Sequence, residues 1–210
     1  MTQEHDLFEI MRTTRSMRRL KADPVPAALI RQVLEAGTMA ANGGNMQNWR
    51  FLVIRDPAIK AAVAAYYRRG WHEGVGPRYR AGGPAPGTTP ERFGRMLDAA
   101  EYLADHFHEA PVWIVPCVAG AKPTRTTGAS IYPAVQNMLL AARALGLGAT
   151  LTTLYLAHER EAEAAMGLPE GVHSYAIIPI GYPMGKFGPV KRTALSDVVY
   201  DDRWGKAWTD

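Results

Sequence analysis

The sequence has few of the features that mark secreted, membrane-spanning or disulfide-stabilised proteins. It contains a single cysteine, Cys117, which excludes an internal disulfide and fits a reducing cytoplasm. No stretch approaches the roughly 18 consecutive apolar residues that a transmembrane helix requires. The N-terminal sequence MTQEHDLFEIM carries acidic residues and no apolar signal core. We therefore expect no secretion signal and a cytoplasmic protein.

Charge of one sign is not concentrated in the sequence either. The 24 lysine and arginine residues are spread among 20 acidic residues, which gives a net charge of +4 at neutral pH. A nucleic-acid-binding protein usually shows a basic stripe or tract, so we expect small phosphorylated ligands, and neither nucleic acid nor membrane as a partner. With 210 residues, 47% of them hydrophobic, the chain can form one domain with a substantial core.

Hydrophobic periodicity predicts helices and strands that alternate unevenly along the chain. Helices come first, and strands then follow between helices of different lengths, which is typical of an α+β or mixed α/β fold. Pro116 lies inside one predicted strand and favours an edge or irregular position for it. The expected helices are 7–14, 26–39, 58–69, 91–107, 129–145 and 158–166, and the expected strands are 49–54, 111–118, 148–154 and 175–180.

Two segments differ in composition from the rest of the chain. Residues 70–90 are rich in glycine and proline and include Trp71 and Tyr79, which predicts a long unstructured stretch that acts as a lid. Residues 189–210 contain one tyrosine and two tryptophans without clear periodicity. Aromatic residues in such a tail indicate that it packs against another surface, and a second subunit is one candidate.

A group of basic residues follows the first predicted helix. Arginines on both sides of Ser16 offer planar charged groups together with a hydroxyl, which suit a terminal phosphate. Taken alone, the group is more simply interpreted as a solvated surface that stabilises the C-terminal end of the helix dipole. Its members are Arg12, Arg15, Arg18, Arg19 and Lys21.

An amide-rich segment, AANGGNMQNWR, lies at residues 40–50 between a predicted helix and a predicted strand. Amide side chains can hydrogen-bond the edge of a heterocycle without charge, and glycines let the backbone approach a ligand closely. An ordinary turn rich in asparagine and glycine is the alternative. The amides are Asn42, Asn45, Gln47 and Asn48, and the glycines are Gly43 and Gly44.

Four motifs together resemble the nitroreductase family of FMN-dependent reductases. RSMRRL followed by NGGNMQNWRFLVI resembles the family's paired signature, and IYPAVQNMLLAARALGLGATLTT resembles its central helix and the strand after it. IIPIGYPMGKFGPVKRTALSDVV, at residues 177–199, resembles the last core strand and the basic tail motif. The resemblance implies one FMN-binding domain over residues 1–210, with a mixed, mainly antiparallel sheet flanked by helices. It also implies an intertwined homodimer, in which the tail at 189–210 embraces the partner.

The resemblance implies roles for residues at the matching positions. The FMN phosphate and ribityl chain would be held by residues from both ends of the sequence, namely Arg15, Ser16, Arg18, Lys191 and Arg192. The flavin would be lined, typically from the partner subunit, by Ala41, Asn42, Gly43, Asn45 and Gln47. Hydroxyl or backbone groups near the flavin ring and its N5 atom would come from Thr152 and Thr153.

The chain departs from the family pattern in the amide-rich segment. The family commonly has proline and then serine where this chain has Ala41 and Asn42, and proline where it has Asn48. The flavin contacts at Ala41 and Asn42 can therefore differ from those of the family.

The implied activity is electron transfer from NAD(P)H through bound FMN to a small acceptor, in a ping-pong mechanism. Nitroaromatics, quinones and activated alkenes are the expected acceptors. Candidate stacking partners for them are Tyr67, Trp71 and Tyr79, with packing inside the lid as the alternative. Reductive dehalogenation, fragmentation of the flavin and a non-enzymatic flavin- or anion-binding role are the competing hypotheses. The cofactor carries the chemistry in such enzymes, so we predict no catalytic acid, base or nucleophile.

Other residues that could carry chemistry do not form a recognisable site in the sequence. His106 and His108 are two apart on a predicted helix and face different directions, so we predict no metal site. His158 lacks the second histidine of a zinc-protease motif. Cys117 lies in an apolar strand and is interpreted as a small buried hydrophobe.

Overall fold

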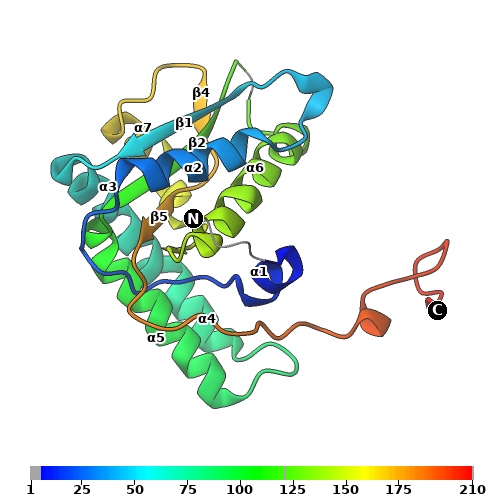
Figure 1. The fold of residues 1–210 in the computed structure, drawn as a ribbon. Coiled ribbons are helices and arrows are strands. Elements are labelled where there is room, and N and C mark those ends of the chain that lie inside the picture. The colour runs from blue at the N-terminus through cyan, green and yellow to red at the C-terminus, as the bar shows by residue number, and fades with distance from the viewer. Residues whose placement is uncertain (1–5, 121, 210) are drawn as a thin grey trace.

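An antiparallel sheet with the strand order β1-β2-β5-β3 forms the centre of the fold, and β4 pairs with β2 beside this path. The computed structural model describes residues 6–120 and 122–209 (Figure 1). The strands are β1 (Trp49–Ile54), β2 (Val112–Ala119), β3 (Gly148–Ala149), β4 (Val172–Ser174) and β5 (Ile178–Gly181). The helices are α1 (Leu7–Thr13), α2 (Ala27–Thr38), α3 (Pro57–Arg69), α4 (Gly76–Gly82), α5 (Pro90–His106), α6 (Arg125–Ala144) and α7 (Glu159–Ala165). Helices plus an antiparallel sheet confirm the predicted α+β class.

Strand β2 explains why helices cover both faces of the sheet. Successive side chains of a strand point to opposite faces. Val112 and Ile114 pack with α2 and α6 in one hydrophobic cluster, whereas Trp113 and Val115 pack with α3, α5 and α7 in another. All four side chains are buried, so the sequence of β2 is a continuous apolar run and does not alternate between apolar and polar residues.

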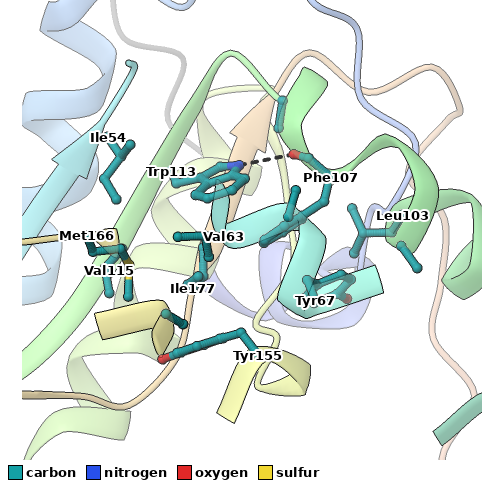
Figure 2. Close-up of a cluster of buried hydrophobic side chains, with 14 of the residues drawn as sticks. Ile54, Val63, Tyr67, Leu103, Phe107, Trp113, Val115, Tyr155, Met166 and Ile177 are labelled. Atoms are coloured by element: carbon teal, nitrogen blue, oxygen red, sulfur yellow. Dashed lines mark hydrogen bonds between the residues drawn. The ribbon is translucent and has the colours of Figure 1, made fainter. Parts of the chain in front are cut away.

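A stack of aromatic rings joins β2 to α3 on the second face (Figure 2). The ring centroids of Phe107 and Trp113 lie 4.2 Å apart, and those of Tyr67 and Phe107 lie 4.1 Å apart. The indole N–H of Trp113 donates to the carbonyl oxygen of Phe107 at 3.2 Å. This stack fixes Tyr67 and thereby the end of α3 that lies near the candidate site described below.

Capping hydrogen bonds set where helices α3 and α6 begin. The Asp56 carboxylate accepts hydrogen bonds from the N–H groups of Ala58 and Ile59 at 2.8 and 3.0 Å, so α3 starts at Pro57, one residue before the predicted start. Thr124 and Thr127 form a reciprocal capping box at the start of α6. Helix α6 therefore begins four residues before the predicted 129, because its polar first turn lacks the apolar periodicity that marks the rest.

The strand that contains Pro116 was predicted to be an edge or irregular strand; the edge position was wrong, whereas its pairing is indeed irregular at Pro116. Strand β2 is central and pairs with β1 on one side and with β4 and β5 on the other. The carbonyl oxygen of Pro116 accepts from the Tyr175 N–H at 2.9 Å, in the gap between β4 and β5. The proline nitrogen points toward the same gap, so the sheet loses no ladder hydrogen bond there.

The expected unstructured stretch at 70–90 was also wrong for its first half. A π-helical segment at Gly70–Val75 continues α3 without a break, and α4 follows directly. Gly70 permits this path, because a Cβ atom there would lie 2.6 Å from the carbonyl oxygen of Leu154. Glycine thus serves close packing here and does not mark a loop.

The two last predicted strands are shorter than expected. Strand β3 covers only the first two residues of 148–154, after which Thr152 pairs with Ile177 through backbone hydrogen bonds of 3.0 and 2.9 Å. Strand β5 covers the end of 175–180, and β4, which precedes it, was not predicted. Short pairings of two to four residues leave too little periodicity to be seen in a sequence.

The segment after Arg192 extends away from the body of the protein (Figure 1). It contains a short helical turn at Leu195–Asp197 and a bridge between Tyr200 and Ala207. Trp204 is 90% exposed, and Leu195 and Val198 are more than half exposed. Within 6–120 and 122–209, no helix has both the length and the hydropathy needed to cross a bilayer.

Candidate functional site

The residues after α1 run as an extended segment along β3 and the chain that follows β5. The Met17 N–H donates to the carbonyl oxygen of Ala149 at 3.0 Å, and the Lys21 N–H donates to that of Tyr182 at 2.8 Å. Met17 and Leu20 are buried in the core. The side chains left on the outer side are those of Arg15, Ser16 and Arg18, of which only Arg18 is half-buried.

Gly148 in β3 permits the close approach of this segment. A Cβ atom at this position would lie 2.8 Å from Cδ2 of Leu20 and 3.0 Å from Cβ of Met17. Any larger residue would push the segment outward. The position of the predicted phosphate-binding residues therefore depends on a glycine in a strand behind them.

The C-terminal segment returns to the same place and completes an open cleft. The Val190 N–H donates to the carbonyl oxygen of Arg12 at 2.9 Å, which brings the basic residues at 191 and 192 beside the end of α1. The cleft has a volume of about 830 Å³, and we call it the arginine cleft. It is lined by Arg15, Ser16, Arg18, Arg92, Arg95, Met96, Ala99, Pro189, Val190, Lys191 and Arg192.

The arginine cleft contains six cationic side chains and no carboxylate in its lining. Within the described parts of the chain, none of the six forms an ion pair with an acidic residue. Burial lowers the pKa of the Arg18 guanidinium, and Arg15 lowers it further, while Tyr67 and Tyr79 act in the opposite direction. An anion bound in the cleft would offset both unfavourable effects.

A second hollow of about 210 Å³ shares Arg15, Ser16 and Arg192 with the arginine cleft. Its other walls come from α1, α6 and β3. Arg143 of α6 lies there, with its Nε donating to Oγ1 of Thr13 at 3.0 Å and its guanidinium 4.3 Å from the ring centre of Phe187. Arg143 is a fixed cation on this wall that the sequence analysis missed.

The amide-rich segment forms a strained loop between α2 and β1. Asn45 and Gln47 have φ angles of 52° and 50°, a region that non-glycine residues seldom occupy. The hydrogen bonds that hold the loop include one from the Gln47 N–H to Asn42 Oδ1 at 2.9 Å and one from the Gly43 N–H to Ser130 Oγ at 3.1 Å. Such strain persists when the surrounding structure fixes it, and it is common at ligand-binding positions.

A mostly apolar cavity of about 310 Å³ lies beside this loop, and we call it the loop cavity. It uses Ser130 near the start of α6, whereas the second hollow uses Arg143 near the end of that helix. At 1.5 Å per residue, these two positions are about 20 Å apart along the helix, whereas the nearest lining residues of the two hollows, Ile131 and Gln136, are about 8 Å apart. The loop cavity is lined by Asn42, Gly43, Met46, Gln47, Asn48, Trp49, Val118, Thr126, Thr127, Ser130 and Ile131.

The structure thus brings the predicted phosphate residues together and leaves the predicted flavin loop elsewhere. Arg15, Ser16, Arg18, Lys191 and Arg192 line one cleft. Asn42, Gly43 and Gln47 line the separate loop cavity, and Ala41 and Asn45 are exposed near it.

Thr152 lies between these regions and faces the core. It is 8% exposed, and its Oγ1 donates to the Tyr67 hydroxyl at 2.8 Å. Burial raises the pKa of Tyr67 to about 12, although the Thr152 hydrogen bond and nearby Arg18 lower it. Tyr67 is therefore neutral and buried, and its hydroxyl is hydrogen-bonded to Thr152. Thr153 is half-buried at the start of a helical turn, and Thr150 takes a place in the second hollow instead.

The three candidate stacking residues differ in exposure. Tyr67 and Trp71 are 2% and 1% exposed, and both belong to the main core cluster, which favours the packing alternative for them. Tyr79 is 45% exposed on α4, with its ring centre 6.3 Å from that of Trp71. Tyr79 is the one of the three that a ligand can reach.

Two arginines of the cleft, Arg92 and Arg95, were not identified from the sequence. They lie on α5 at a spacing of three residues, with Met96 and Ala99 on the same stripe. Arginine on an exposed helix face is ordinary in a sequence. Only the packing of α5 shows that this stripe faces the cleft.

A polar group away from the cleft has a structural explanation. Glu159, Glu163 and His173 have ligand atoms within 4.8 Å of one another. Oε1 of Glu163 already accepts from the N–H and Oγ of Ser174 at 2.6 and 2.8 Å, which joins α7 to β4. Cys117 nearby is buried as expected, and burial raises the pKa of its thiol to about 12.

Comparisons with known proteins agree with this architecture. The model of the Nitroreductase family matches residues 11–182. A protein named NADH dehydrogenase from Thermus thermophilus is 32% identical over 88% of the chain and 90% of its own length. An iodotyrosine deiodinase from Thermotoga neapolitana is 25% identical over 84% of the chain and 88% of its length. A nitroreductase structure in complex with FMN, from Desulfovibrio desulfuricans, is 26% identical with a TM-score of 0.70, over 96% of the chain and 99% of its own.

Proposed function

Because the chain belongs to the nitroreductase family, we propose that it is an FMN-dependent oxidoreductase that uses NAD(P)H to reduce nitroaromatics, quinones or related small acceptors. The arginine cleft carries this proposal. It gathers residues from both ends of the chain and from α5 around one space in which no lining residue is acidic. Such a lining is unfavourable unless an anion occupies it.

The donor set of the arginine cleft fits the phosphate of FMN. Arg15, Arg18 and Arg192 supply guanidinium groups that can each make two parallel bonds to phosphate oxygens. Ser16 supplies a hydroxyl beside them, and Lys191 supplies a further positive charge. When bound, FMN would accept a hydride from the nicotinamide and pass the electrons to the acceptor.

The loop cavity fits the flavin ring, but a second copy of the chain would be needed to bring it to the arginine cleft. The cavity has mostly apolar walls and exposed backbone and amide groups at Gly43 and Gln47. In one chain it is separate from the arginine cleft and shares no lining residue with it. A homodimer, in which the loop of one protomer approaches the arginine cleft of the other, would unite the two. The exposed aromatic tail after Arg192 supplies a surface for the same association.

Behind the cleft, Tyr67 and Thr152 would position groups near the flavin. Their hydroxyls are hydrogen-bonded and almost fully buried, so neither is free to exchange protons with solvent. The raised pKa of Tyr67 keeps it neutral at physiological pH. These residues would help to hold the backbone beside the cleft in place, and we assign no catalytic acid or base.

Reductive dehalogenation is the second candidate, because a deiodinase is among the relatives that match over most of the chain. The two functions share FMN and differ in the acceptor. Exposed Tyr79 beside the cleft region is compatible with an aromatic acceptor of either kind.

One experiment tests the proposal and separates the candidates. The purified protein is examined for bound flavin by its visible spectrum and is then mixed anaerobically with NADH or NADPH. We expect a yellow protein whose flavin is bleached by at least one donor and reoxidised by a nitroaromatic or a quinone. Bleaching by neither donor, with reoxidation of dithionite-reduced protein by a halogenated phenol, would favour dehalogenation. A colourless protein that does not take up added FMN would refute both.

A further inference from the structure

The arginine cleft has more positive charge than FMN alone neutralises. Its lining supplies six cationic side chains. A phosphate monoester carries about −1.5 to −2 charge at neutral pH, so about four positive charges would remain after FMN binding. Like charges held in one cleft repel one another, and such an arrangement persists when further anions are bound there.

Arg92 and Arg95 are the members of this set that the FMN phosphate least needs. The other four lie on the two chain segments at 15–18 and 191–192, which meet at the end of α1. Arg92 and Arg95 come from the opposite wall, on α5. Their exposed side chains stand beside half-buried Met96 and Ala99, so the stripe combines two cations with a small apolar surface.

The position of Arg92 opposes helix stability. It lies in the first turn of α5, where the Thr89 hydroxyl caps its N–H at 3.4 Å. The positive end of the helix dipole favours an acidic residue at this position and disfavours arginine. A residue that opposes the local preference and faces a cleft indicates a role in binding.

The acidic residues of α5 do not neutralise the pair. Glu101 and Asp105 bind Arg80 and His72 on another side of the helix, at 2.7 and 2.8 Å. Within the described residues, Arg92 and Arg95 form no ion pair with any carboxylate, the neighbouring Glu91 and Asp98 included.

The pKa of Glu91 is consistent with this separation. It is lowered first by a hydrogen bond from its own backbone and then by Thr89, whereas Arg95 has the smallest effect. Glu91 and Arg95 therefore attract each other only weakly, without forming an ion pair.

We propose that Arg92 and Arg95 form a second anion subsite, which binds a carboxylate or phosphate carried by the molecule that exchanges electrons with the flavin. Met96 and Ala99 would contact the apolar body of that molecule. The inference rests on the proposed function and adds that the site selects anionic ligands over neutral ones of the same shape. The anion belongs either to an acidic aromatic acceptor or to a phosphorylated nicotinamide donor.

The test measures equilibrium binding to the oxidised, FMN-loaded protein, with the change in flavin absorbance as the signal. The wild type is titrated with 4-nitrobenzoate against 4-nitrobenzamide, and with NADP⁺ against NAD⁺. The same titrations are made on the Arg92→Gln/Arg95→Gln double variant. A matched control, Arg31→Gln/Arg55→Gln, removes the same charge from two exposed arginines outside the cleft.

We expect the wild type to prefer the anionic member of at least one pair, and the double variant to bind that anion about tenfold more weakly, the scale of two solvent-accessible ion pairs. Binding of the neutral partner, FMN affinity and the control variant should be unchanged. Loss for 4-nitrobenzoate alone identifies an acidic acceptor, and loss for NADP⁺ alone identifies the donor.

Equal binding of both members of each pair by the wild type, or an unchanged preference in the double variant, would overturn the inference. So would a drop in FMN affinity of the double variant that matches the drop in binding of the anion, because the pair would then belong to the FMN phosphate wall. A wild type that retains no FMN would instead refute the proposed function itself.

Discussion

The arginine cleft and the loop cavity differ in charge and polarity. The cleft is open and cationic, with side chains from both ends of the chain and from α5. The cavity is smaller and mostly apolar, and its polar groups are backbone and amide atoms on a strained loop. A cofactor with a phosphate at one end and a heterocycle at the other needs both surfaces. Each chain offers both, in two hollows that share no lining residue.

In the function proposed above, the two hollows are half-sites that a dimer would combine into one FMN site. The cleft is fixed by packing from behind, through Gly148, Met17 and Leu20. The loop is exposed and is fixed by hydrogen bonds, which include those at Asn42 and Ser130. Substitutions in the cleft and in the loop should therefore differ in how much they weaken FMN binding and in which other properties they change.

The largest effect should come from removing charge from the cleft. We expect Arg18→Ala to weaken FMN binding about 10- to 100-fold, because charge-assisted hydrogen bonds are worth roughly 1.5–3 kcal/mol each. Fluorescence titration of the apoprotein with FMN measures this. Arg19→Ala is the matched control, since exposed Arg19 lies over the Tyr102 ring and does not line the cleft. Equal FMN affinity in both variants would remove Arg18 from the phosphate site.

A smaller effect should follow from displacing the cleft wall without changing its charge. In Gly148→Ala the new methyl group would press on Met17 and Leu20, and overpacking of this kind costs roughly 1–3 kcal/mol of stability. We expect a lower midpoint of denaturant unfolding and a weaker FMN affinity together. Gly94→Ala on α5, where a Cβ meets open space, should show neither loss. Lower stability with unchanged FMN affinity would show that FMN binding does not depend on the packing of Gly148 against this segment.

The loop should respond more weakly still. Ser130→Ala removes the hydrogen bond to the Gly43 N–H, and an ordinary hydrogen bond contributes about 0.5–1.5 kcal/mol. We expect faster amide exchange at Gly43 to Gln47 and an FMN affinity reduced only a few-fold. An effect on FMN affinity as large as that of Arg18→Ala would mean that the two half-sites do not differ as described.

The smallest effect concerns the core behind the cleft at alkaline pH. Burial raises the pKa of Tyr67 from 10.0 to about 12, so the folded state holds its proton longer than the unfolded state. The stability from neutral Tyr67 is present below pH 10.0 and is lost as the pH rises toward about 12. In Tyr67→Phe, the free energy of unfolding should fall less steeply over this interval in urea titrations. If the free energy of unfolding depends on pH in the same way in Tyr67→Phe and in the wild type, the pKa of Tyr67 is not raised in the folded state.

The half-sites differ in how far the sequence could predict them. Arg15, Ser16 and Arg18 lie in one motif and Lys191 and Arg192 in another, but residue type alone favoured a solvated surface, and it was the resemblance to the family that selected them. Arg92 and Arg95 escaped notice because helical periodicity identifies faces but not which tertiary neighbour each face meets.

The same limit explains the errors of fold and burial. Pro116 suggested an edge strand because the gap between β4 and β5 that accommodates it forms only in the assembled sheet. Tyr67 and Trp71 suggested stacking partners beside a loop, whereas a continuous helical path places both in the core. Helix starts were predictable where a cap such as Asp56 marks them, because capping depends on neighbouring residues alone.

The central claim is that a complete FMN site combines the arginine cleft of one protomer with the loop of another. The most direct test is the FMN content of mixed dimers made by coexpressing Arg18→Ala and Gly43→Trp chains. Each variant alone should retain little FMN, since both of its sites are damaged. The mixture should recover flavin in a fraction of its sites, because each mixed dimer carries one site with an intact cleft and an intact loop. Mixed dimers that hold no more FMN than the single variants would contradict the account.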